Sequence, residues 1–217
     1  MKKDGTLTMD KIFREIDIID NIFNCKRDNV DVATVMDLSA SLNREIHIPE
    51  VLEGCGGEVD LAVRYWNRLD EEKRIPVEER QPILFYIDCS GGNLTDAFMI
   101  SDTIRQSKTP VYTIITGAAL SGGFIIAISG HKRIAYPHAS FLFHEGSGGF
   151  GGDANKFANF ALFYKKQLEQ MKDIILNQTS ITEEKYKEIK NDDYWMTADE
   201  ALELGVIDEI YGSDTVI

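Results

Sequence analysis

The residue with the clearest chemical potential in this 217-residue chain is Ser121. It lies between a β-branched run at 111–115, typical of a buried strand, and an apolar run at 122–129, typical of the start of a buried helix. Free backbone N–H groups at the start of a helix favour developing negative charge, as acyl transfer requires. A helix N-cap serine flanked by glycines would give the same pattern. The choice depends on whether a base and an acid accompany it.

Of the four histidines, His144 is the best candidate for a general base. It follows an apolar strand predicted at 140–143 and opens a glycine-rich loop, and ligands gather at the ends of strands in parallel sheets. The candidate acid is Asp193, although spacing alone cannot choose between it and its neighbour Asp192. The chain order serine, histidine, aspartate differs from that of α/β-hydrolases, and Ala119 breaks the Gly-x-Ser-x-Gly elbow. A lipase or esterase is therefore disfavoured.

Composition excludes several classes of protein. With 43% hydrophobic residues the chain can bury one domain, and its net charge of −13 argues against a general nucleic-acid binder. No window approaches about 18 consecutive apolar residues, and no signal-peptide core is visible. The three cysteines (Cys25, Cys55 and Cys89) lack metal-ligand spacing and are interpreted as reduced thiols. We expect a cytoplasmic protein with no membrane segment and no metal.

The first half of the chain predicts an α/β fold preceded by a separate segment. Residues 1–43 are expected to form a divergent helical N-terminal segment, and 44–217 the main domain. A short strand is expected near 44–49. The helix that follows, at about 59–72, should turn four side chains inward: Leu61, Val63, Trp66 and Leu69.

The middle of the chain contains a βαβ unit. A buried strand at 82–88, a glycine turn, a helix at 94–106 and a strand at 111–115 predict a mostly parallel sheet. Two short strands follow the Ser121 helix. A glycine-rich stretch then leads to a long helix at about 154–177, and Thr197 begins a C-terminal capping box.

Six motifs together resemble ClpP, the proteolytic subunit of the Clp protease, over about residues 44–212. They occur in order at 87–92, 117–123, 132–139, 141–144, 193–198 and 200–208. The glycine turn and the last motif are shared with the whole crotonase-like superfamily, so the specificity comes from the serine, histidine and aspartate together.

The resemblance implies a role for each candidate residue. Ser121 matches the family nucleophile, His144 the base and Asp193 the orienting acid. The implied oxyanion donors are backbone amides of three glycines: Gly91, Gly92 and Gly122. The implied strand that binds substrate backbone by strand addition contains four residues: Gly146, Ser147, Gly148 and Gly149.

The resemblance also implies an architecture and partners. The fold would be the ClpP/crotonase-like α/β fold, with repeated ββα units around a mostly parallel sheet and a protruding handle helix at about 153–178. The subunits would form heptameric rings, stacked as a tetradecamer, that cleave unfolded polypeptides in a closed chamber. The chain itself would need no cofactor. Any ATP would be used by a partner AAA+ unfoldase.

Several positions, Asp88, Cys89 and Gly146 among them, depart from the ClpP pattern and leave room for different functions. Ser90 stands where the family usually has proline, Gly122 where it has methionine, and Glu145 where it has glutamine. Residues 121–124 are closer to the signal peptide peptidase A family, which uses a Ser–Lys dyad but lacks a histidine at the position of His144. An acyl-CoA enzyme of the crotonase group and a catalytically silent ring subunit also remain open. The histidine favours the Clp-type triad.

Overall fold

The computed structural model describes residues 39–149, 151–212 and 214–215. The predicted helical segment at 1–43 therefore lies almost entirely outside the described residues. The chain divides into two compact units, Met1–Glu45 and Ile46–Ile217. The second unit contains all the candidate site residues.

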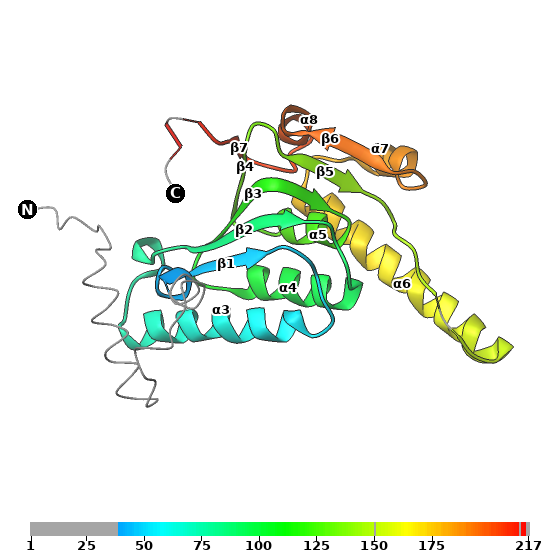
Figure 1. Ribbon diagram of the computed structural model, residues 1–217, viewed down its shortest axis with the longest axis horizontal. Helices are drawn as coiled ribbons and strands as arrows, with labels where there is room; N and C mark the ends of the chain where they lie inside the picture. The colour runs from blue at the N-terminus through cyan, green and yellow to red at the C-terminus, as the bar shows by residue number, and fades with distance from the viewer. Residues whose placement is uncertain (1–38, 150, 213, 216–217) are drawn as a thin grey trace, which may run out of the picture. The chain divides into compact units, whose positions relative to one another are not determined.

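A seven-stranded, mostly parallel sheet forms the centre of this unit, as predicted (Figure 1). Its main path runs β1-β2-β3-β4-β7, and β5 and β6 branch from β3. β5 and β6 pair antiparallel, whereas β3 pairs parallel with β2, β4 and β5. The strands are β1 (Glu45–Ile48), β2 (Ile83–Cys89), β3 (Val111–Leu120), β4 (Lys132–Ala135), β5 (Ser140–Phe143), β6 (Tyr194–Thr197) and β7 (Glu209–Ile210).

Strand β3 is twice as long as the sequence indicates, and this extra length matters for the site. Its first half pairs with β4, and residues Ala118–Leu120 then pair with β5. Small residues such as Ala118 have low strand propensity, so only this long-range pairing keeps them extended. The sheet therefore forks just before Ser121.

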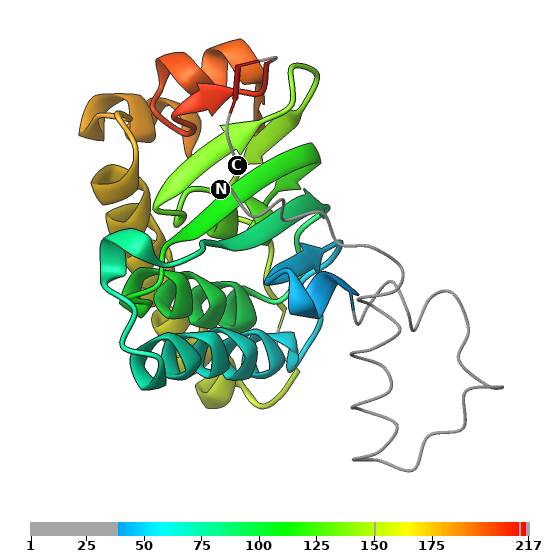
Figure 2. The same ribbon diagram turned by 90° about the vertical axis from the view of Figure 1, so that its left-hand side faces the viewer.

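Helices pack on the sheet, and two of them, α4 and α5, begin directly after turns that follow β2 and β3. They are α3 (Cys55–Glu72), the short 3₁₀ helix η2 (Val77–Glu79), α4 (Leu94–Gln106), α5 (Gly122–Ala127), α6 (Ala154–Gln178), α7 (Glu183–Ile189) and α8 (Ala198–Glu203). Figure 2 shows α3 and α4 side by side below the sheet. Val63 and Trp66 are buried as predicted, but the prediction for Leu61 is wrong, because its side chain is 64% exposed. The predicted capping box at Thr197 is present in α8.

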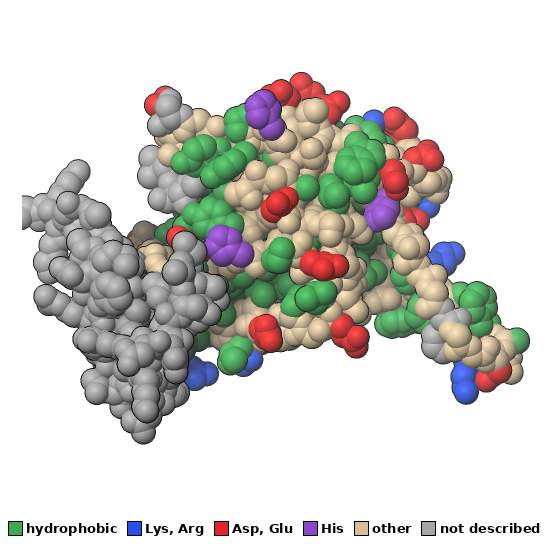
Figure 3. Space-filling model, viewed as in Figure 1, with side chains coloured by type: hydrophobic (Ala, Val, Ile, Leu, Met, Phe, Trp, Pro, Cys, Tyr) green, Lys and Arg blue, Asp and Glu red, His purple; other side chains and the backbone are tan. Residues whose placement is uncertain are grey.

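Helix α6 projects beyond the sheet (Figure 1). Only Met171 and Ile175, in its C-terminal half, are buried. Hydrophobic side chains gather along the projecting end (Figure 3), and Phe157, Leu162 and Phe163 are each more than half exposed. None of the helices in the described ranges combines the length and apolarity needed to cross a bilayer.

An arginine fastens β4 to the chain end and to the base of α6. The Arg133 guanidinium donates to the carbonyls of Gln178 and Gly205 and to both oxygens of Asp208. The Asp208 carboxylate also accepts the Arg133 backbone N–H, at 2.8 Å. Because only 14% of the Arg133 side chain is exposed, its positive charge is stabilised mainly by these partners and not by water.

We predict that Asp208→Ala destabilises the fold by about 1–3 kcal/mol, because it leaves a largely buried guanidinium without its counter-ion. Urea unfolding followed by circular dichroism measures this loss. The matched control is Glu188→Ala, which breaks the exposed ion pair with Lys185 and should leave the midpoint nearly unchanged. Equal midpoints for the two variants would contradict the anchoring role of Arg133.

Candidate functional site

Ser121 has a strained backbone at the junction of β3 and α5. Its φ of 54° and ψ of −116° lie in a region that residues other than glycine rarely adopt. Its amide donates to the carbonyl of Leu142 in β5, at 3.0 Å, and its carbonyl accepts from the amide of Phe124 at 3.0 Å. The side chain makes no cap hydrogen bond to α5. The N-cap interpretation therefore loses its main support, and the hydroxyl is left available at the tip of a strand–turn–helix elbow.

A second turn, at Gly91 and Gly92, approaches Ser121 closely. Both glycines have positive φ, 107° and 137°. A Cβ at Gly91 would lie 2.8 Å from the Ser121 Cβ, and one at Gly92 would lie 2.2 Å from the carbonyl oxygen of Val51. Only glycine fits at either position.

The two turns present unpaired amides to the same region. In the described part of the chain, the N–H groups of Gly92 and Gly122 have no protein acceptor, and a Cβ on Gly122 would lie 3.5 Å from the Gly92 nitrogen. The Gly91 amide differs, because it donates to the Cys89 Sγ at 3.4 Å. Of the three predicted oxyanion donors, Gly92 and Gly122 are therefore free to bind an anion, and Gly91 is already engaged.

Cys89 supports this turn without competing as a nucleophile. The residue is completely buried at the end of β2, and this burial raises the pKa of its thiol. A thiol that stays protonated is unreactive but can still accept the Gly91 amide.

The antiparallel pairing of β5 with β6 brings His144 to Asp193. Phe143 pairs with Tyr194, so the next residue on β5 stands opposite the preceding residue on β6. His144 Nδ1 lies 3.1 Å from Asp193 Oδ1. The backbone amide of Asp192 donates to Ile189, and within the described ranges its carboxylate has no such contact with a histidine. The strand register thus distinguishes two neighbouring aspartates that spacing alone could not.

Ser121, His144, Gly92 and Gly122 line one cleft of about 430 Å³. The described hydrogen bonds include none between the Ser121 and His144 side chains. Such bonds are often long in an unliganded enzyme and tighten when substrate binds. Asp193 is 63% exposed and His144 30%, so the pair faces solvent at the edge of this cleft.

Glu145, next to His144, is held by residues on two helices. Its carboxylate accepts from the Tyr186 hydroxyl at 3.1 Å and lies 3.7 Å from the Lys190 ammonium, while its carbonyl accepts from the Tyr164 hydroxyl at 3.0 Å. Burial, and secondly the nearby Glu145 charge, raise the pKa of both phenols, so both remain donors. The departure from the usual glutamine thus has a structural role that the sequence did not reveal. It fixes the chain just beyond His144.

The glycine-rich segment after Glu145 lines the same cleft but is not a strand. Gly146, Ser147, Gly148 and Gly149 have no regular structure, and Gly146 has a φ of 73°. The predicted strand is therefore corrected to an irregular loop in the single chain. A strand needs a partner ladder, and no described residue supplies one here.

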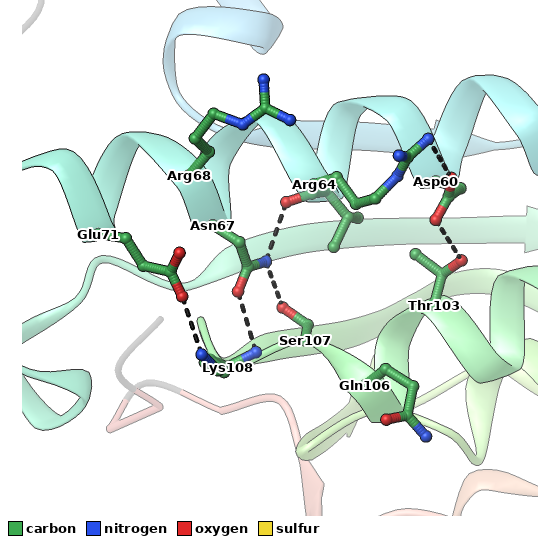
Figure 4. Close-up of a pocket in the computed structure, with 10 residues that line it drawn as sticks. Asp60, Arg64, Asn67, Arg68, Glu71, Thr103, Gln106, Ser107 and Lys108 are labelled. Carbon is green, nitrogen blue, oxygen red and sulfur yellow. Dashed lines mark hydrogen bonds and ion pairs between the residues drawn. The ribbon is translucent and has the colours of Figure 1, made fainter.

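A second pocket is less suited to bind a ligand or catalyse a reaction. A hollow of about 400 Å³ lies between α3 and α4 (Figure 4), but most of its polar side chains bond one another or nearby backbone groups. Asn67, for example, donates to Ser107 and accepts from the amides of Lys108 and Thr109. Among the described residues, no His, Cys, Asp and Glu side chains form a cluster suited to a metal ion.

Comparison with known proteins gives matches over the part of the chain that contains the candidate site. The family model described as Clp protease matches residues 76–214, a range that includes all the candidate site residues. The chain is 36% identical over 132 residues to an ATP-dependent Clp protease proteolytic subunit of Deinococcus radiodurans, covering 60% of this chain and 65% of that protein. It is 35% identical over 133 residues to proteolytic subunit 2 of Cutibacterium acnes, covering 60% of this chain and 63% of that protein.

A longer alignment joins the chain to proteolytic subunit 1 of Shouchella clausii, with 31% identity over 163 residues, or 74% of this chain and 80% of the relative. The chain spans less than two thirds of the Deinococcus and Cutibacterium proteins. The family model nevertheless covers more than half of this chain. The chain therefore belongs to the Clp protease family, as a divergent member.

Proposed function

We propose that this chain is a serine endopeptidase subunit that cleaves unfolded polypeptides through Ser121, His144 and Asp193. The observation that carries the proposal is the β5–β6 register, which brings His144 within hydrogen-bond distance of Asp193. His144 lines the same cleft as Ser121, whose backbone is strained. Membership of the Clp protease family supports the same reaction class.

The proposed mechanism assigns one task to each group. His144 Nε2 takes the proton from Ser121 Oγ as the hydroxyl attacks the peptide carbonyl. Asp193 holds the proton on Nδ1 and so keeps the ring in the right tautomer. The tetrahedral oxyanion would be bound by the free amides of Gly92 and Gly122. His144 then protonates the leaving amine, and a water molecule releases the acyl group by the reverse steps.

The loop at Gly146–Gly149 would bind the substrate backbone. An extended peptide in the cleft could supply the partner strand that the loop lacks, with backbone hydrogen bonds that do not depend on sequence. Such binding suits unfolded polypeptides of varied sequence.

A Ser–Lys dyad of the signal peptide peptidase A type has less support. No lysine is among the described residues that line the Ser121 cleft, and the histidine absent from that family is bonded to an acid here.

Assembly into rings is the second part of the proposal. The exposed apolar side chains of Phe157, Leu162 and Phe163 make α6 a suitable handle between stacked heptameric rings. The crotonase-like repeats, the closed chamber, the cytoplasmic location and an ATP-consuming AAA+ unfoldase partner belong to this proposal. Each is what membership of the family leads us to expect.

The triad is tested by hydrolysis of a fluorescently labelled unfolded protein. We expect Ser121→Ala and His144→Ala each to lower kcat by at least about 10³-fold, and Asp193→Asn by about 10²–10⁴-fold. Asp192→Asn is the matched control and should keep kcat within about twofold of wild type. Full turnover by Ser121→Ala would disprove the proposed role of Ser121 as nucleophile. A loss of kcat in Asp192→Asn but not in Asp193→Asn would assign the role of the acid to Asp192.

The oxyanion turn is tested by Gly92→Ala. A Cβ at this position would collide with the Val51 carbonyl, so the turn must shift and the rate of Ser121 labelling by a fluorophosphonate should fall by at least about 10²-fold. Gly57→Ala is the control, because nothing lies within 4 Å of a Cβ there and the site is helical. A normal labelling rate in folded Gly92→Ala would rule out this turn as an oxyanion donor.

Assembly is tested by native mass spectrometry at micromolar concentration. We expect the wild-type chain to form a ring-based oligomer, and Phe163→Glu to shift it toward smaller species, because the substitution replaces an exposed apolar side chain of α6 with a charge. Lys165→Glu, on the same helix, should leave the assembly unchanged. A monomeric wild-type chain would contradict this part of the proposal.

A further inference from the structure

Asp96 supplies a helix cap from outside the helix that it caps. Helix α3 begins after Gly54, which has a φ of 89° and no side chain to cap with. The Asp96 carboxylate, in the first turn of α4, accepts from the amides of Gly54 at 3.1 Å and Gly56 at 2.9 Å. Asp96 is only 8% exposed. The first turns of the two helices are thus joined through one buried carboxylate.

The segment held by Asp96 continues directly into the oxyanion turn. Val51, three residues before Gly54, donates its amide to the Gly91 carbonyl and accepts from the Asn93 amide, both at 2.8 Å. The Gly91 carbonyl and the Gly92 N–H belong to one planar trans peptide unit, so they point in opposite directions. By fixing the carbonyl, Val51 also fixes the direction of the Gly92 N–H.

Asp96 closes this chain of contacts. Its own amide donates to the Asn93 side chain at 3.1 Å, which caps α4 directly after the glycine turn. The turn is therefore held on one side by Val51 and on the other by the start of α4, and Asp96 ties these two sides together.

We infer that Asp96 is a positioning residue for the Gly92 amide, acting through Val51. This inference rests on the proposed oxyanion role of that amide. Asp96 itself does not touch the reacting atoms. Its loss should weaken transition-state binding more than ground-state binding, because only the transition state carries the oxyanion.

The far end of the same helix pair provides a matched control. There Asn67 of α3 bonds Ser107 and the amide of Lys108 (Figure 4). Its side chain also accepts from the amide of Thr109. Asn67→Ala removes a similar set of hydrogen bonds, between α3 and the residues that directly follow α4, but none of these bonds involves Val51 or the glycine turn. It should lower stability while leaving turnover intact.

The experiment compares Asp96→Asn with Asn67→Ala in the full chain. The amide side chain keeps the volume of Asp96 but can accept with only one of its two terminal atoms. For Asp96→Asn we expect kcat on a short peptide to fall about 10- to 100-fold and affinity for a peptide boronate to fall by a similar factor, with KM within about threefold. For Asn67→Ala we expect kcat within about twofold and a lowered urea midpoint.

Hydrogen–deuterium exchange gives a readout that does not need activity. Exchange of the peptide containing residues 90–93 should increase in Asp96→Asn and stay at the wild-type level in Asn67→Ala. Unchanged exchange and kcat in folded Asp96→Asn would overturn the inference. Equal losses of kcat in Asp96→Asn and Asn67→Ala, if the two variants are equally stable, would also overturn the inference. If wild-type hydrolysis does not depend on Ser121, the proposed function fails, and the exchange measurement alone then decides whether Asp96 orders the turn.

Discussion

Ser121 holds a backbone conformation that costs a residue with a side chain about 1–3 kcal/mol, and the surrounding structure is built to maintain it. The fork of the sheet supplies the support, because β3 ends at Leu120 while β5 accepts the Ser121 amide through Leu142. The Gly91 turn packs so closely against Ser121 that a Cβ on Gly91 would lie 2.8 Å from the Ser121 Cβ. In this conformation Ser121 lines the cleft, and its side chain makes no cap hydrogen bond to α5.

The partners of Ser121 are fixed by separate elements that converge on the same cleft. His144 and Asp193 are matched by the antiparallel β5–β6 ladder, and Glu145 ties the residue after the histidine to α6 and α7. The free amides come from the Gly92 turn and the start of α5. Since α6 both anchors this region and exposes apolar side chains at its projecting end, assembly and alignment of the site are physically linked in the proposal.

Local patterns predicted the regular elements well. Helix α4 at Leu94–Gln106 and strand β5 at Ser140–Phe143 were predicted with the observed bounds, because a capping residue or turn marks their ends. The orientation of α3 was only partly predicted: Val63 and Trp66 are buried but Leu61 is exposed, and the helix begins at Cys55, where Asp96 of α4 caps it. Sequence periodicity does not contain that long-range contact.

The candidate site was predictable in its residue types but not in its geometry. Ser121 and His144 stand at element ends that the sequence marks clearly. The choice of Asp193 over Asp192 depends on strand register, between residues 49 positions apart. The engagement of the Gly91 amide by Cys89 and the lack of a strand at Gly146–Gly149 likewise depend on contacts that spacing does not encode.

The proposed site is tested most directly by an experimental structure of the chain after reaction with a fluorophosphonate. We expect phosphorus bonded to Ser121 Oγ, its oxygen within hydrogen-bond distance of the Gly92 and Gly122 amides, and His144 still bonded to Asp193. An adduct on another residue, or an oxygen turned away from both amides, would contradict the proposed site.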